Sequence, residues 1–189
     1  MNPSPLLSRL LAAALLAACL PLAAQAQAHK EDAYASVTRL MEAGQLAEAQ
    51  ARADRHMAEH PRDPQMRFIQ STLLSRRGQH AEAEALLVQL TQDFPELAEP
   101  YNNLAVLYAA RGDLPRAREA LEHALRLSPG YATAHENLGD VYLRLAAQAY
   151  ARAQAEGGHQ ARLAPKADAI VRLLPPAPPP PQPPGAARP

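Results

Sequence analysis

The sequence predicts an all-α protein assembled from repeated pairs of antiparallel helices, and three observations lead to this prediction. Of the 189 residues, 48% are hydrophobic but only 4% are aromatic, so the core must be made largely of Ala and Leu. Both residues are strong helix formers, whereas the aromatic and β-branched residues that favour strands are sparse. Glycines and prolines also recur at a constant spacing through the middle of the chain, which is typical of a repeat protein.

The first 26 residues are predicted to be an export signal that is removed by cleavage. Residues 1–9 carry one positive charge and no acid, residues 10–24 are almost wholly apolar, and cleavage sites of the A-x-A type end at Ala26 and Ala28. The apolar stretch is shorter than the roughly 18 residues expected of a membrane-spanning helix. We therefore expect an exported, periplasmic bacterial protein.

A second interpretation of this segment stays open. Leu16-Ala17-Ala18-Cys19 resembles the lipobox of bacterial lipoproteins, in which the cysteine is acylated and becomes the new N-terminus. Cys19 would then be lipidated and would anchor the protein to a membrane. Otherwise Cys19, the only cysteine of the chain, leaves with the signal, and the mature protein contains no disulfide.

A period of 34 residues organises the middle of the chain. Two columns of residues share this spacing: Gly44, Gly78 and Gly112, and Pro61, Pro95 and Pro129. A glycine ends a helix easily because it adopts a left-handed conformation without strain, and a proline placed after a helix cannot continue it. Each unit is therefore predicted to be a helix, a tight turn and a second helix, and Asp113 is expected to cap the helix after its turn.

This pattern resembles the tetratricopeptide repeat family. Residues 98–131 carry nearly the whole signature: Tyr101, Leu104, Ala105, Tyr108, Gly112, Ala117, Leu121, Ala124 and Pro129. The repeat register gives units at residues 30–63, 64–97, 98–131 and 132–163, the last one degenerate. The resemblance implies that they stack into a right-handed superhelical array whose first helices line a concave groove for extended peptides or partner helices.

The outer units depart from the pattern. His56 and Leu90 stand in a column where a small residue is usual, which predicts looser helix packing. The fourth unit lacks the turn glycine, so we expect one long helix to about Ala155 that ends at Gly157-Gly158.

The C-terminal residues are predicted to form a cap and a tail. Residues 164–174 should be a short helix that opens at Pro165 and covers the exposed end of the array with its apolar residues: Ala169, Ile170, Leu173 and Leu174. Nine of the 15 residues in 175–189 are prolines, which favours an extended, disordered tail that acts as a spacer.

Neither charge nor motifs indicate nucleic-acid binding or catalysis. The 19 basic and 19 acidic residues cancel, whereas a nucleic-acid-binding domain needs a basic surface. His56 and His60 flank Glu59, but the order His-Glu-x-x-His of zinc proteases is absent, and a solvated helix end is expected there. Because the glycines are isolated, no phosphate loop is present either. We expect no catalytic residue, no cofactor and no metal.

Six polar residues are predicted to be exposed in the groove and to bind a partner: Asn102, Asn103, Asn137, Asp140, Arg76 and Arg144. Asn103 and Asn137 are one period apart and should stack on one face, where an amide can both donate to and accept from a peptide backbone. They resemble the peptide-binding asparagine ladder in the repeat domain of O-linked N-acetylglucosamine transferase. The alternative is that they bond neighbouring backbone groups. Arg76 and Arg144 are predicted to bind a carboxylate of the partner, and the alternative is that they remain solvated.

The sequence therefore predicts a non-catalytic periplasmic adaptor that binds proteins or peptides of the cell envelope. One alternative is an assembly factor for pili or outer-membrane proteins that is lipid-anchored at Cys19. Another is an accessory domain of an envelope enzyme. Fold alone does not choose among these functions.

Overall fold

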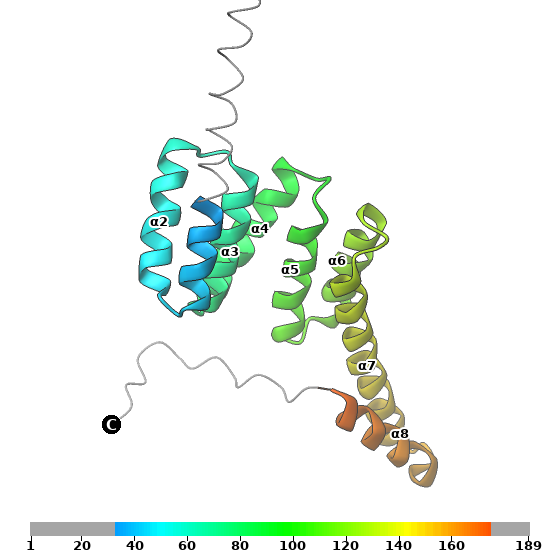
Figure 1. Cartoon of the computed structure of the whole chain (residues 1–189). Coiled ribbons are helices and arrows are strands. Elements are labelled where there is room, and N and C mark those ends of the chain that lie inside the picture. The colour runs from blue at the N-terminus through cyan, green and yellow to red at the C-terminus, as the bar shows by residue number, and fades with distance from the viewer. Residues whose placement is uncertain (1–32, 175–189) are drawn as a thin grey trace, which may run out of the picture. The chain divides into compact units, whose positions relative to one another are not determined.

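The computed structural model describes residues 33–174 and shows only helices as regular secondary structure within that range (Figure 1). The predicted signal, Cys19 and the proline-rich tail lie outside the described residues. The first helix covers residues 33–42 of this range. Seven helices follow it: α2 (Leu46–Glu59), α3 (Pro64–Arg76), α4 (His80–Asp93), α5 (Ala98–Ala110), α6 (Leu114–Leu127), α7 (Ala132–Ala155) and α8 (Gln160–Leu173). The prediction of an all-α fold with antiparallel helix pairs is confirmed.

The chain divides into two compact units, and the division falls between Leu73 and Leu74, in the last turn of α3. Unit 1 contains the first helix, α2 and most of α3. Unit 2 contains the end of α3 and the helices α4 to α8.

The turns form where the glycine column predicts them. Gly44, Gly78 and Gly112 have φ angles of 73°, 77° and 85°, the left-handed region that favours glycine. After Gly112, the Asp113 N–H donates to the carbonyl of Tyr108 at 2.9 Å, which closes the end of α5. Asp113 then caps α6 as predicted, because its side chain accepts from the N–H of Arg116.

The core of unit 1 is apolar and close-packed. Val37, Ala49, Ala53, Met66 and Leu73 have no exposed surface. The two alanines lie on one face of α2, four residues apart, so the neighbouring helices can approach closely.

A buried polar cluster lies beside this core and corrects the prediction of a solvated helix end at His56. The His56 side chain is buried, and its Nε2 lies 2.9 Å from Oδ2 of Asp63. The Tyr34 hydroxyl donates to the same oxygen at 2.5 Å. Asp63 lies just after the turn that follows α2, and it supplies the acceptor that allows the imidazole to be buried. His60 packs against the imidazole, with 4.9 Å between ring centroids.

Asp63 also begins α3. Its Oδ1 accepts from the backbone N–H groups of Gln65 and Met66 at 3.0 and 3.2 Å, which is the geometry of an N-cap. Burial alone would raise the pKa of Asp63, but the hydrogen bonds from Tyr34, His56 and Met66 outweigh it and lower that pKa below its ordinary value. The pKa of Tyr34 is raised by burial and by the neighbouring Asp63 carboxylate.

Unit 2 is built around α5, which packs against α4, α6 and α7. Leu104 and Tyr108 are buried, as the repeat pattern predicts, and so are Leu87 of α4 and Leu121 of α6. Tyr101, which the pattern also buries, is only half-buried, and its ring stacks on His123 with 4.1 Å between centroids.

The long helix of the fourth unit ends as predicted. α7 runs to Ala155, Gly157 has a φ of 80°, and the N–H of Gly158 donates to the carbonyl of Ala153 at 2.8 Å. This is the bond pattern of a glycine-terminated helix.

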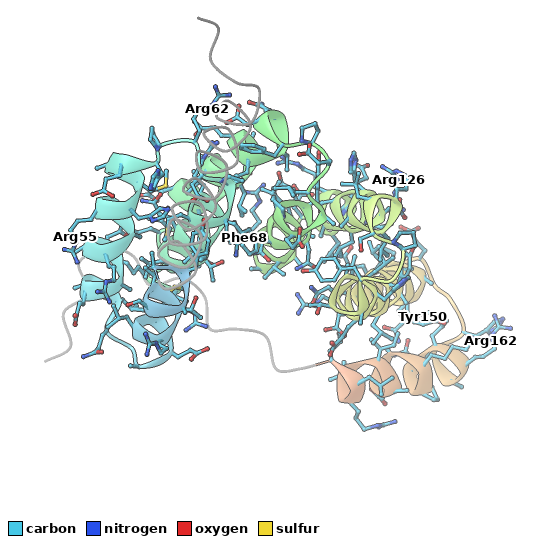
Figure 2. The ribbon with its side chains drawn as sticks, turned by 45° about the horizontal axis from the view of Figure 1, so that its top comes forward. Arg55, Arg62, Phe68, Arg126, Tyr150 and Arg162 are labelled. Carbon is cyan, nitrogen blue, oxygen red and sulfur yellow. The ribbon has the colours of Figure 1, made fainter. Side chains whose placement is uncertain are left out.

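The capping helix differs from its prediction. α8 begins at Gln160, so Pro165 lies inside it and does not open it. A proline that close to the first turn removes only one helical hydrogen bond, and packing on α7 compensates for the loss. Leu163 and Ile170 are buried, whereas Leu173, which was expected to cover the array, is the last helical residue and is 66% exposed. Tyr150 of α7 lies toward α8 (Figure 2), with Lys166 Nζ 5.5 Å from its ring centroid.

Candidate functional site

A pocket of about 170 Å³ opens between α5 and α7, and we call it the α5–α7 pocket. Three helices supply its lining: Ala105, Val106, Ala109 and Ala110 of α5, Leu121 of α6, and Asn137, Asp140, Val141 and Arg144 of α7. On α7 the lining residues are spaced by three and four, so they share one face of the helix. On α5 the alanines have short side chains, which leaves the space open.

Three of the six predicted partner-binding residues line this pocket: Asn137, Asp140 and Arg144. Val106 is 48% exposed, so part of the lining is accessible. The structure thus brings together the predicted residues of the fourth unit. The other three predicted residues, Asn102, Asn103 and Arg76, do not line it.

Asn102 is a correction, because it is buried and only 4% exposed. The prediction treated α5 as open on its groove side, whereas α7 covers part of that side. Asn102 is held there by amide hydrogen bonds: its Oδ1 accepts from Nδ2 of Asn137 at 2.8 Å, and its Nδ2 donates to Oδ1 of Asn103 at 3.3 Å. Its burial is therefore balanced by paired polar atoms.

The asparagines form a chain across two helices. Asn137 of α7 bonds Asn102 of α5, which bonds its neighbour Asn103, so Asn137 is joined to Asn103 through the amide of Asn102. Both bonds join one side chain to another. They differ from the alternative prediction, in which the asparagines bond neighbouring backbone groups. One bond occupies one N–H of Asn137, while an amide can make four hydrogen bonds. Asn137 can therefore bond Asn102 and a ligand together.

Arg144 is positioned by the end of α5. Its Nη1 donates to the carbonyl oxygen of Ala109 at 3.3 Å, in the last turn of that helix, where carbonyls carry partial negative charge. A guanidinium has five N–H donors. Asp140, one turn earlier on α7, adds a carboxylate to the same lining. Arg76, by contrast, lies exposed at the end of α3 and does not line the pocket.

A charged network holds the end of α5 that forms one wall of the pocket. Two guanidinium groups lie near the Tyr108 ring, at 4.7 Å from its centroid for Arg111 and 4.1 Å for Arg116, and Arg116 donates to its hydroxyl at 2.8 Å. Arg111 also pairs with Glu84 of α4. Burial raises the pKa of Tyr108, and the bond to Glu84 raises the pKa of Arg111. The phenol is therefore a neutral hydrogen-bond acceptor for Arg116 at neutral pH.

Sequence analysis did not assign four apolar residues of the pocket to the groove. It placed Ala105 and Leu121 in the packing signature, and it did not consider Ala109 or Val141. A usable signal was the run of small residues on α5 facing the polar face of α7. Sequence analysis also missed the cluster of Tyr34, His56 and Asp63, since no motif describes it.

Two negative findings concern the described range, residues 33–174. No three His, Cys, Asp or Glu side chains there are grouped so that they could hold a metal ion. None of the helices in that range is both long and apolar enough to cross a membrane.

One family model matches part of the chain. The family model described as "TPR repeat" matches residues 107–145, which include the end of α5, all of α6 and the first half of α7. Residues 107–145 of the chain therefore resemble a tetratricopeptide repeat. The matched segment includes most residues of the α5–α7 pocket.

Curated tetratricopeptide repeat proteins resemble part of the chain. The chloroplastic tetratricopeptide repeat domain-containing protein PYG7 of Arabidopsis thaliana is 37% identical over 79 residues, which are 40% of this chain and 26% of the relative. The TPR repeat-containing protein YvcD of Bacillus subtilis is 38% identical over 65 residues, 34% of this chain and 13% of the relative. The chain thus matches about a quarter or less of the length of these relatives.

Solved tetratricopeptide structures share the fold. The first tetratricopeptide domain of Spaghetti (RPAP3), bound to an HSP90 peptide, gives a TM-score of 0.55 at 19% identity over 60% of this chain and 90% of that one. YrrB, described as having an unusual peptide-binding site, gives 0.50 at 25% identity over 55% and 54%. MamA of Desulfovibrio magneticus gives 0.52 at 20% identity over 76% and 74%.

Proposed function

We propose that this tetratricopeptide protein is a non-catalytic adaptor that binds an extended peptide segment of a partner protein in the α5–α7 pocket. The observation that carries the proposal is the lining itself, an apolar floor with Asn137, Asp140 and Arg144 on one face of α7. Concave sites with an apolar surface and a few convergent polar groups are the usual form of a binding site.

The polar groups suit a peptide backbone. An extended peptide presents N–H donors and carbonyl acceptors that need partners when water is displaced. Asp140 can accept, Arg144 can donate, and Asn137 can do both. The Spaghetti (RPAP3) domain was solved with an HSP90 peptide, and YrrB is described as having a peptide-binding site. This supports peptide binding here by analogy of fold.

The experiment is site-specific photo-crosslinking in whole cells. A photoreactive phenylalanine analogue replaces Val106, which is 48% exposed in the pocket lining, and in a matched control it replaces Val171, which is 69% exposed on α8. We expect adducts with a partner from position 106 that the control at position 171 does not give. The same adducts from both positions, or adducts from position 171 alone, would place the binding surface elsewhere.

We further propose that the adaptor works in the periplasm, among proteins of the cell envelope. The support is the order of charged, apolar and cleavable regions in residues 1–28. Intact mass of the protein purified from cells distinguishes the two forms of this proposal. A mass lacking residues 1–26 or 1–28 means cleavage after the signal, whereas a chain that begins at an acylated Cys19 means a membrane anchor. A full-length, unmodified mass would exclude both.

A further inference from the structure

We propose that the α5–α7 pocket accepts one branched aliphatic side chain, Leu, Ile or Val, from an uncharged extended peptide segment. The inference rests on the proposed function and adds the class of ligand. It depends on two properties of the lining, the size of its apolar floor and the balance of its charges.

The size of the pocket suits one medium-sized apolar group. Its volume is about 170 Å³, and an apolar cavity of about 150 Å³ in another protein holds one benzene molecule. The floor consists of Ala105, Ala109, Leu121 and Val141, which present no polar side-chain atom. Burial of an aliphatic side chain against such a surface is favourable, whereas a charged side chain would lose its hydration there.

The charge of the lining does not favour an acidic ligand. Asp140 and Arg144 are the only charged residues among those that line the pocket, and their formal charges cancel. The guanidinium of Arg144 already donates to the carbonyl of Ala109. A site that selects a chain-terminal carboxylate or an acidic stretch needs an excess of positive charge, and here a carboxylate would meet Asp140.

The polar residues therefore have another role, which is to hold the backbone on both sides of the aliphatic residue. A peptide N–H can donate to Asp140, and a peptide carbonyl can accept from Asn137 or Arg144. Asn137 is held in place by its bond to Asn102, so its amide is oriented before a ligand arrives. Such an arrangement selects one side chain of the peptide by its shape. The contacts to the peptide backbone do not depend on the peptide's sequence.

The test begins with peptide display. The full chain selects binders from a library of random peptides, and affinities of synthetic peptides are then measured by fluorescence polarisation. We expect the selected peptides to share one Leu, Ile or Val without an excess of Asp and Glu. Replacing that residue by Ala or Asp should weaken binding at least about tenfold, since even one methylene changes recognition in an apolar pocket by about ten- to 200-fold.

Two variants locate the effect. Ala109→Leu fills the floor and should also weaken binding about tenfold or more, whereas Ala151→Leu on an exposed position of α7 outside the pocket should not. Circular dichroism and the melting temperature show whether each variant folds. Asp140→Lys leaves the floor unchanged and makes the lining cationic, so repeating the selection on it should enrich acidic peptides.

The outcomes separate this inference from the proposed function. Peptides that lose affinity in Ala109→Leu but show no aliphatic preference would overturn the inference and keep the peptide site. Selection of acidic peptides by the natural protein would do the same. Peptides that bind Ala109→Leu as well as the natural protein, or a selection that yields no binder at all, would overturn both.

Discussion

Replacing Asp63 by Ala should destabilise unit 1 more than any exposed substitution in it. Asp63 is the acceptor for two side chains, Tyr34 and His56, and for the backbone N–H groups of Gln65 and Met66. An ionised carboxylate is an acceptor only, so the His56 Nε2 must carry the hydrogen in this bond. Truncation would leave every one of these donors without its acceptor.

The size of the effect follows from these contacts. Loss of the N-cap of α3 costs about 1 kcal/mol. The His56 ring is buried and would cost about 2 kcal/mol without an acceptor, and the partly buried Tyr34 hydroxyl would cost about 1 kcal/mol. The expected decrease in the free energy of unfolding is thus about 4 kcal/mol, a large part of the stability of a small domain. Asp63→Asn keeps a good N-cap but loses one acceptor oxygen, so about half of this loss is expected.

Hydrogen exchange measured by mass spectrometry on residues 33–73 is the assay, because it reports on unit 1 alone. A loss of about 4 kcal/mol corresponds to an exchange rate about 1,000-fold faster for amides that open with the unit. Arg55→Ala, at an exposed position on α2, is the control and should change the rate little. If Asp63→Ala exchanged within threefold of this control, the cluster would not be a stabilising element and the reasoning would be wrong.

Three further predictions concern pH, a turn and the last helix. The pKa of Asp63 is lower in the folded state than the unfolded value of about 3.9, so the ionised Asp63 contributes its full stability above that value. This stability is lost as the pH falls toward the folded-state pKa. The free energy of unfolding should therefore decrease less steeply with falling pH in Asp63→Asn than in the natural protein. Gly112→Ala should cost about 1 kcal/mol in urea unfolding, because φ is 85° there, whereas Gly130→Ala, where φ is not in the left-handed region, should cost less. Pro165→Ala restores a helical N–H in α8 and should slow hydrogen exchange across Gln160–Leu173, and unchanged or faster exchange would contradict this.

Sequence alone predicted the features that depend on local conformation. A helix end that requires a left-handed residue is visible as Gly112, and the missing glycine in the fourth unit predicted the unbroken length of α7. Burial that depends on contacts with other segments could not be predicted in this way. Asn102 lies on α5 at a position that a single helix would expose, and its burial depends on the position of α7. Likewise His56 shares the buried face of α2 with Ala49 and Ala53, but its polar ring has a hydrogen-bond partner there only because Asp63 lies beyond the next turn.

The two polar clusters differ in how fully their hydrogen bonds are used, and this difference bears on function. Both oxygens of Asp63 accept from protein donors, and each of these bonds lies within unit 1. Such a cluster stabilises the fold and has little capacity left for a ligand. At the α5–α7 pocket, Asn137 and Arg144 each make one bond that fixes their position, yet an amide can make four hydrogen bonds and a guanidinium five. Side chains that are held in place and still have donors to offer beside an apolar floor are suited to bind a partner. Substitutions of Asp140 or Arg144 should therefore change binding with little effect on stability, whereas loss of the Asn137 amide would also leave Oδ1 of the buried Asn102 unpaired.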